Sequence, residues 1–372
     1  MTASQTEVAA MRRALALAAT DGVPLGPNPR VGCVLLAPDG SVVAEGYHRG
    51  AGAPHAEVDA LARAGAAARG ATAGVTLEPC NHTGRTGPCA VALVEAGVRR
   101  VVAAQRDTNP VATGGAETLR AAGVEVETGV LEDDARALNQ VWTFAVEHRR
   151  PFVTWKLATT LDGRSAAADG SSRWVSSAAA RVDTHRLRSI CDTMLVGTGT
   201  VALDDPHLTL RDGAGALLPR QPLRAVMGLR DLAPGRRVLD DAAETVHLRT
   251  RDPGSALAEL FARDRQHVLL EGGPTLAAAF LTAGLVDEVV AYVAPMLLGA
   301  GLSAVGDLGI TTITGALHLP VTDVTVLAPL HEGDDLNLRL TLRPPTSSVQ
   351  PVETTSKRPS VEPVETTTEG KH

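Results

Sequence analysis

The sequence predicts two α/β domains in succession, followed by a tail. Apolar runs suited to buried strands alternate with segments of helical period from residue 7 to about residue 342. A polar stretch with a proline, residues 147–151, interrupts this alternation, so we place one domain over 1–148 and the other over 149–343. Residues 344–372 are rich in Pro, Ser, Thr and Glu and lack aromatic residues, which predicts a disordered tail; a partner-binding tail is the less favoured alternative.

The elements of the first domain follow from the spacing of apolar residues and from the turn residues between them. Val8, Met11, Leu15 and Ala18 lie three or four positions apart, which indicates one face of a helix. In chain order, we expect a helix over 7–19, a hairpin over 31–44, a helix from His55 to before Gly70, a strand over 75–77, a helix from Pro88, strands over 100–103 and 124–126, and a helix over 131–146.

The second domain continues the alternation. In chain order, we expect a strand over 152–157, a helix over 177–190, strands over 193–196 and 223–227, a helix over 255–263, a strand over 267–270, a helix over 276–283, a strand over 288–294 and a last strand over 336–342. Leucines alternate with other residues in this last strand, which predicts that one of its faces is solvated.

Composition excludes several classes of protein. The chain has 372 residues, a net charge of −7 and 44% hydrophobic residues, which is enough for two ordinary cores but does not provide the basic surface of a dedicated nucleic-acid binder. No run approaches the ~18 apolar residues of a membrane span, and Glu7, Arg12 and Arg13 lie where a signal peptide would be apolar. We therefore expect a soluble cytoplasmic protein without membrane or nucleic-acid partners. Four cysteines in so long a chain are a poor disulfide framework.

One stretch of the first domain carries metal chemistry. Pro54-His55-Ala56-Glu57 is followed by Cys80 and Cys89, each preceded by a proline. One histidine and two cysteines are the three ligands of a catalytic zinc that keeps its fourth position open for water. A glutamate two positions after the histidine is the proton carrier in zinc-dependent deaminases of nucleobases, so Glu57 is the predicted catalytic residue.

Two other interpretations of the same residues remain open. The zinc site could be closed, with His82 as the fourth ligand, or the three residues could be unrelated buried side chains. The nine-residue step from Cys80 to Cys89 is also longer than the usual spacing in zinc deaminases.

These segments resemble the deaminase half of the bifunctional riboflavin-biosynthesis deaminase/reductase family, in which the long step between the cysteines is diagnostic. The resemblance rests on Asn28-Pro29-Arg30-Val31-Gly32-Cys33, Gly46-Tyr47-His48, Pro54 to Glu57 and Glu78 to Cys89. It implies a cytidine-deaminase-like three-layer domain, with His55, Cys80 and Cys89 as zinc ligands and Glu57 as the proton shuttle. It also implies substrate contacts from Asn28, His82 and Arg85. The loop 107–115 departs from the family pattern, which leaves its substrate contacts open.

The second half resembles the reductase half of the same family, which is similar to dihydrofolate reductase in fold and uses NADPH. The matching segments, in the family's order, include Lys156 to Gly163, His185-x-x-Arg188, Gly197-x-Gly-Thr200 and Glu271-Gly272-Gly273-Pro274. The resemblance implies NADPH contacts from Ala158, Trp174, Thr200, Asp204, Gly273, Pro274 and Thr275. It implies substrate contacts from Ser172, Arg188, Leu208, Arg211 and Glu271. Lys156 and Glu271 are both candidates for the proton donor.

The resemblance implies a two-step enzyme of riboflavin synthesis. The first half is expected to deaminate 2,5-diamino-6-ribosylamino-4(3H)-pyrimidinone 5′-phosphate, and the second to reduce 5-amino-6-(5-phosphoribosylamino)uracil to the ribitylamino product with NADPH. One alternative is a deaminase for another base, which leaves the second half unexplained. Another is a catalytically silent sensor of a pyrimidine phosphate and NADPH, against which the intact Glu57 argues. Family members are often oligomeric, so a homo-oligomer is a further expectation.

Overall fold

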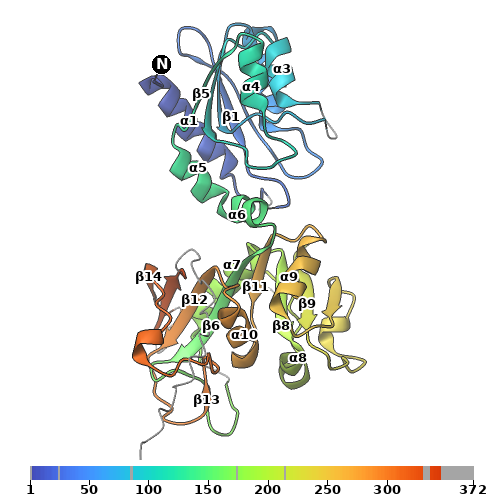
Figure 1. The fold of residues 1–372 in the computed structure, drawn as a ribbon, viewed down its shortest axis with the longest axis vertical. Helices are drawn as coiled ribbons and strands as arrows, with labels where there is room; N and C mark the ends of the chain where they lie inside the picture. Colours follow the sequence, from blue (N-terminus) through green and yellow to red (C-terminus); the bar gives the residue numbers. More distant parts are fainter. Residues whose placement is uncertain are drawn as a thin grey trace, which may run out of the picture.

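The computed structural model describes residues 2–23, 26–83, 87–172, 175–212, 215–329 and 336–344. It contains two sheets, each with its own helices, stacked along the long axis of the molecule (Figure 1). The expectation of two α/β domains is confirmed. The predicted disorder of the tail concerns residues that lie, except for Pro344, outside the described ones. Within the described residues, no helix is long and apolar enough to cross a membrane.

The first sheet has the strand order β2-β1-β3-β4-β5, in which β1 is antiparallel to both neighbours and β3, β4 and β5 are parallel. Its elements are α1 (Gln5–Ala18), β1 (Gly32–Leu36), β2 (Val42–Tyr47), α2 (Ala56–Ala64), η1 (Gly65–Ala68), β3 (Thr72–Leu77), α3 (Cys89–Glu95), β4 (Arg100–Gln105), α4 (Gly115–Ala121), β5 (Glu125–Thr128), α5 (Glu132–Leu138) and α6 (Gln140–His148).

Helices cover both faces of this sheet, as a three-layer domain requires. One face packs its apolar side chains against α2, α3 and α4, and the other packs against α1 and α5. Alternate residues of one strand serve the two faces: Cys33 and Leu35 of β1 point to the first layer, and Val34 and Leu36 to the second.

Two elements of this domain differ from the sequence-based expectation. The helix expected over 131–146 is two helices, α5 and α6, separated at Asn139. The Asn139 side chain accepts a hydrogen bond from the Arg30 amide at 2.8 Å and donates one to the Arg30 carbonyl at 2.9 Å. The polar side chain therefore pairs with a distant backbone segment at the point where the helix is interrupted. The short helix α4 was not predicted, because its seven residues show too little periodicity.

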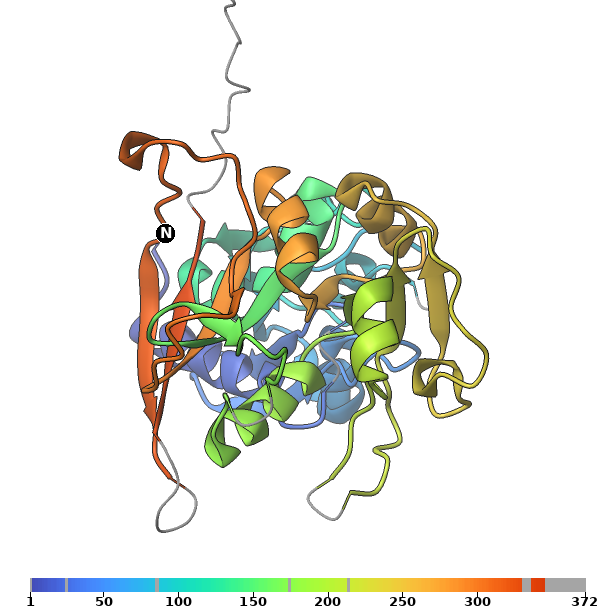
Figure 2. The ribbon, with the colours of Figure 1, turned by 90° about the horizontal axis from the view of Figure 1, so that it is seen from below.

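The second sheet has the strand order β10-β9-β8-β11-β6-β12-β15-β14, parallel from β10 to β12 and antiparallel from β12 to β14. Figure 2 shows it from below, with the strands near residue 325 at one end and those near residue 245 at the other. Its elements are β6 (Phe152–Thr160), β7 (Arg164–Ala166), α7 (Ala178–Ser189), β8 (Thr193–Gly197), α8 (Thr198–Asp204), β9 (Leu223–Met227), η2 (Arg237–Leu239), β10 (Thr245–Leu248), α9 (Pro253–Phe261), β11 (His267–Leu270), α10 (Pro274–Thr282), β12 (Glu288–Ala294), β13 (Leu302–Ser303), η3 (Ile313–Gly315), β14 (Val321–Leu327) and β15 (Asn337–Leu342).

This domain follows the expected order, with additions. The last helix, α10, begins at Pro274 and not at residue 276, because proline suits the first helical position. The elements β7, α8, η2, β10, β13, η3 and β14 were not expected. β14 lies at the edge of the sheet with most of its residues exposed, so its sequence lacks the buried face that would have indicated a strand.

The two domains meet across α6 and the start of β6. Arg150 forms two hydrogen bonds of 2.7 Å to the Asp287 carboxylate, and its guanidinium lies 4.6 Å from the centre of the Phe144 ring. Phe144 in turn packs edge to face against Phe152, the first residue of β6. The charge pair holds Arg150, which follows α6 directly, on the second domain, and the contacts of Phe144 with Arg150 and Phe152 hold α6 there.

Close contact between α2 and β2 depends on Gly46. A Cβ atom at this position would lie 2.4 Å from the Ala56 carbonyl oxygen and 2.5 Å from the Ala60 amide nitrogen. We expect Gly46→Ala to push α2 away from the sheet, to destabilise the first domain by about 1–3 kcal/mol and to lower its thermal unfolding midpoint by several degrees. Gly199→Ala is the control, because no atom lies within 4 Å of its Cβ position. An equal loss of stability in both variants would contradict this explanation.

Candidate functional site

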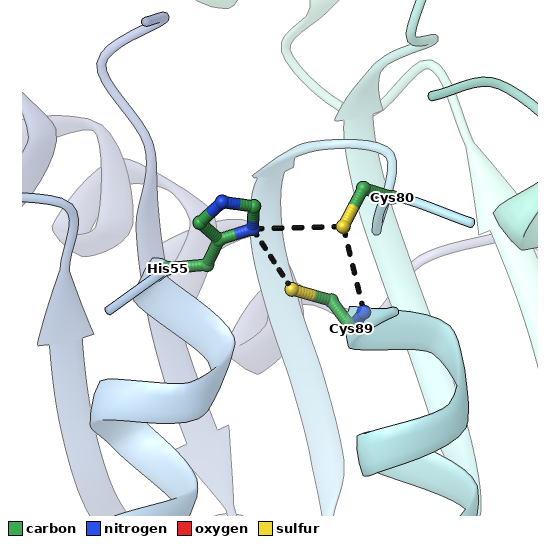
Figure 3. Close-up of side chains that lie close together, drawn as sticks. All are labelled: His55, Cys80 and Cys89. Atoms are coloured by element: carbon green, nitrogen blue, oxygen red, sulfur yellow. Dashed lines mark hydrogen bonds between the residues drawn. The ribbon is translucent and has the colours of Figure 1, made fainter. Parts of the chain in front are cut away.

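Three side chains converge where two helices begin in the first domain. His55 lies immediately before α2, Cys80 follows β3, and Cys89 is the first residue of α3. The His55 Nδ1 atom lies 3.2 Å from the Cys89 sulfur and 3.5 Å from the Cys80 sulfur (Figure 3). All three ligand atoms lie within 4.8 Å of one another, which is compact enough for a single metal ion.

The local electrostatics favour a thiolate at this point. The Cys89 amide, at the start of α3, donates to the Cys80 sulfur at 3.5 Å. Hydrogen bonds from Cys89 and His55 lower the pKa of Cys80 to about 4, whereas the contact with Cys80 and burial raise the pKa of Cys89. Thiolates and a neutral imidazole are the donors that zinc prefers, so these residues fit a zinc ion.

His82 is not a member of this group of ligand atoms. Its ring centre lies 6.5 Å from that of His55, and its buried Nδ1 atom has no hydrogen-bond partner among the described residues. The described geometry therefore offers three ligands, as an open catalytic site requires, and does not supply the fourth ligand of a closed one.

A cavity of about 450 Å³ opens at this cluster. Asn28, His55, Glu57, Cys80 and His82 all line it, so the structure brings together the predicted deaminase residues that it describes, apart from Cys89, which lies beside the cavity with the other ligands. Glu57 is only 3% exposed, and burial raises its pKa to about 7. Arg85 lies outside the described residues.

His48 fixes the orientation of Asn28 in the cavity wall. The His48 Nδ1 atom lies 2.9 Å from the Pro54 carbonyl oxygen, which can only accept, so Nδ1 carries the proton. The Nε2 atom is then an acceptor for the Asn28 side-chain amide at 3.0 Å. Burial lowers the pKa of His48, which keeps the ring neutral. One of the two N–H groups of the Asn28 side chain is thus used, and the other N–H and the side-chain oxygen remain for hydrogen bonds to a ligand.

Four further residues, Glu78, Asp107, Asn109 and Trp142, also line the cavity. Glu78 and Trp142 were not named as site residues from the sequence. Asp107 and Asn109 belong to the loop 107–115, whose substrate contacts the sequence left open; this loop follows β4, at a place where ligands of open α/β sheets commonly bind. Burial raises the pKa of Asp107 to about 6. Glu78 accepts a hydrogen bond from the Ala116 amide at 2.9 Å, which positions the start of α4.

In the second domain, the predicted substrate residues Arg188 and Glu271 form a pair. Two hydrogen bonds of 2.6 and 2.8 Å join the Arg188 guanidinium to the Glu271 carboxylate. Lys156 on β6 lies half-buried beside them, and desolvation lowers its pKa. Two cations therefore face one carboxylate, which leaves a net positive environment suited to an anionic ligand.

Two helix N-termini lie at the carboxyl ends of adjacent parallel strands of this domain. α8 follows β8 and carries Thr200 and Asp204, and α10 follows β11 and begins with Pro274 and Thr275. A Cβ atom at Gly197 would contact Leu276 of α10 at 3.8 Å, so the two helix starts are close together. No atom lies within 4 Å of the Cβ position of Gly273, so the N-terminus of α10 is open on this side. Pro274 has no N–H and the Leu276 amide donates to the Gly273 carbonyl, so Thr275 carries the first amide of α10 that can face a phosphate. These features fit a pyrophosphate such as that of NADPH.

The structure describes four of the remaining predicted residues of this domain. Ala158 lies on β6, and Leu208 is buried with a left-handed backbone, φ 51°. Ser172 is exposed, and Arg211 donates to the Gly215 carbonyl at 2.8 Å on the surface. Trp174 lies outside the described residues.

The fold and the two sites define a zinc-dependent deaminase joined to a dihydrofolate-reductase-like reductase. Residues 4–105 match the model of the cytidine and deoxycytidylate deaminase zinc-binding region, and residues 151–329 match that of the RibD C-terminal domain. Both expected fold types are thereby confirmed, with zinc as the cofactor of the first domain and NADPH as that of the second.

Individual relatives show which family the chain belongs to. The riboflavin biosynthesis protein RibD of Mycobacterium tuberculosis H37Rv is 52% identical over 85% of this chain and 92% of its own length, and that of Escherichia coli K12 is 39% identical over 89% and 98%. The solved structure of Acinetobacter baumannii RibD is 37% identical, with a TM-score of 0.83 over 92% of this chain and 99% of that chain. The Thermotoga maritima diaminohydroxyphosphoribosylaminopyrimidine deaminase/5-amino-6-(5-phosphoribosylamino)uracil reductase is 33% identical, with a TM-score of 0.80 over 91% and 99%. The chain belongs to the RibD family of riboflavin biosynthesis enzymes, which confirms the resemblance and the bifunctional activity expected from it.

We expect Cys80→Ser to lose most of the bound zinc, because a serine hydroxyl is a far weaker zinc ligand than a thiolate. Cys191→Ser is the matched control, since Cys191 is buried in the other domain and only donates to the Leu187 carbonyl. Metal analysis of the purified proteins should give close to one zinc per chain for the wild type and the control. Full zinc content in the Cys80 variant would show that Cys80 is not a zinc ligand.

Proposed function

We propose that the first domain, residues 1–148, removes an amine from 2,5-diamino-6-ribosylamino-4(3H)-pyrimidinone 5′-phosphate. The second, residues 149–343, then reduces 5-amino-6-(5-phosphoribosylamino)uracil with NADPH. The proposal rests on one cavity, which is lined by Glu57, Asn28 and two of the three ligand side chains, those of His55 and Cys80. The Thermotoga maritima relative is named for both reactions, which supports these substrates.

In the deamination, His55, Cys80 and Cys89 hold the zinc. When bound, zinc acts as a Lewis acid that makes a water molecule nucleophilic near neutral pH. Glu57 moves the protons: it accepts one from the attacking water, passes it to a ring nitrogen of the pyrimidine and later protonates the leaving amine. The carbon–nitrogen bond to the amine breaks, a carbonyl takes its place, and ammonia leaves. Burial of Glu57 keeps bulk water away from these transfers.

The other cavity residues bind the substrate in this proposal. Asn28, oriented by its bond to His48, hydrogen-bonds the pyrimidine through its side-chain oxygen and its remaining N–H. The His82 Nδ1 atom, which has no hydrogen-bond partner among the described residues, contacts the ribose phosphate together with Arg85.

In the reduction, bound NADPH would supply the hydride that reduces the sugar. Thr200, Asp204 and the Gly273-Pro274-Thr275 turn bind its phosphates and ribose, and Ala158 and Trp174 contact the rest of the cofactor. Arg188 and Glu271, with Ser172, Leu208 and Arg211, bind the substrate. Lys156 lies beside this pair and is the proton donor of the proposal, because burial lowers its pKa and so eases proton release.

The proposed setting is the cytoplasm. All four cysteines are free thiols, and a reducing compartment keeps them available as ligands.

We also infer that the chain self-associates, since the edge strand β14 exposes Val321, Val324 and Val326, apolar side chains that a second copy would cover. Light scattering of the purified protein measures this directly, and a monomer mass would contradict it.

We expect Glu57→Gln to lower the rate of ammonia release from the diaminopyrimidine about 100-fold or more, because the glutamine amide cannot carry the proton. Zinc should stay bound. The same variant should still reduce the uracil substrate with NADPH at the wild-type rate. Product masses by mass spectrometry separate the two steps, since deamination and reduction change the mass differently. Undiminished ammonia release would exclude Glu57 as the shuttle.

The converse variant is Glu271→Gln, which keeps the side-chain volume but weakens the charged pair with Arg188. We expect kcat/KM for reduction to fall about 10- to 100-fold, with deamination unchanged. NADPH consumption followed by absorbance measures the first rate and ammonia release the second. Equal losses of both activities would indicate a folding defect and not a role in the reductase site.

A further inference from the structure

The cavity of the deaminase site has a wall from the other domain. Asp264 and Gln266, which lie between α9 and β11 of the second domain, line it together with residues of the first. These two residues are more than 200 positions away from Asn28 in the sequence. The site of the first reaction is therefore built partly by the domain that performs the second.

The second sheet holds Gln266 in a fixed position. Its backbone amide donates to the Asp192 carboxylate at 2.7 Å, and its carbonyl accepts from the Phe152 amide at 2.8 Å. The next residue, His267, begins β11, whose four residues are all buried. The backbone of Gln266 is thus anchored from two sides, and its side chain projects from a rigid support.

The Gln266 side chain reaches the segment that carries Asn28. Its Nε2 atom donates to the Pro27 carbonyl at 2.9 Å. Its Oε1 atom is buried and lies 3.2 Å from the Cβ position of Gly26, so the side chain packs closely against this segment.

The segment needs such an anchor. Pro27 and Pro29 have no backbone N–H, so these residues can be held by hydrogen bonds only through their carbonyl groups. On the C-terminal side, Arg30 is held by Asn139 through both its amide and its carbonyl. On the N-terminal side, the bond from Gln266 to the Pro27 carbonyl fulfils this role. Asn28 lies between the two anchors, with its side chain turned to His48.

We propose that Gln266 is a positioning residue of the deaminase site, which it serves from the reductase domain by holding Pro27 so that Asn28 faces the substrate. This inference rests on the proposed function for the role of Asn28. It predicts that deamination depends on a contact between the domains that takes no part in the chemistry of either.

The test uses the full-length, zinc-loaded protein and the diaminopyrimidine ribose phosphate. Loss of one such hydrogen bond in Gln266→Ala should raise the KM of deamination between about twofold and about tenfold, with kcat much less affected. Gln266→Glu keeps the size but turns an oxygen toward the Pro27 carbonyl, so its KM should rise at least as much. Zinc content and the rate of reduction should equal those of the wild type. An unchanged KM in both variants would overturn the proposal.

Gln140→Ala is the matched control. It removes another hydrogen bond between the domains, the 2.8 Å bond from Arg343 to Gln140, but neither residue lines the cavity. The KM of deamination should stay at the wild-type value. An equal rise in this variant would show that any loosening of the interface has the same effect, which would refute a specific role for Gln266.

A double-mutant comparison tests the route through Asn28. In an Asn28→Ala background, Gln266→Ala should add little to KM, because the residue that it positions is already absent. Full additivity of the two effects would exclude this route.

Hydrogen exchange separates this inference from the proposed function. The amides of Asn28 and Arg30 should exchange faster in Gln266→Ala than in the wild type or in Gln140→Ala, whatever the substrate is. Wild-type protein that releases no ammonia from the diaminopyrimidine would refute the proposed substrate alone. Unchanged exchange in Gln266→Ala would refute the positioning role alone.

Discussion

The convergence of one imidazole and two thiols on a space less than 5 Å across is the constraint on which the first domain depends. The three ligands come from separate segments, so the packing of α2, β3 and α3 must be correct within a fraction of an ångström. Glycine makes this possible at two points. Gly46 lets α2 lie against β2, and Gly115 lies so near the Pro79 carbonyl that a Cβ atom would be 1.7 Å from its oxygen. The second contact fixes the chain directly before Cys80.

In the second domain, three charged side chains lie close together and partly out of solvent. Arg188, Lys156 and Glu271 are all withdrawn from solvent, where an unpaired charge is costly. The two hydrogen bonds between Arg188 and Glu271 offset this cost and hold both side chains in one geometry. An excess of one positive charge remains in the group. In a protein that handles phosphorylated substrates, such an excess is better explained by ligand binding than by stability.

The junction between the domains has more than a mechanical role. α6 supplies Trp142 to the deaminase cavity and leads through Arg150 into β6, and Gln266 returns from the second sheet to the same cavity. The first active site is thus connected to the second domain both through the chain and through a side-chain contact. Fusion of two enzymes in one chain keeps these groups together at every turnover.

The sequence by itself determined the two-domain α/β class, most of the elements and the zinc chemistry, because periodicity and ligand spacing are local properties. It identified Glu57 beside His55 for the same reason. It could not reveal the break at Asn139 or the contribution of Gln266, since each depends on a partner more than 100 residues away. It also could not reveal the hydrogen bonds between Arg188 and Glu271, because a sequence motif does not show which side chains contact each other in the fold. Only the tertiary structure decided these features, since they arise from the docking of one sheet and its helices against another.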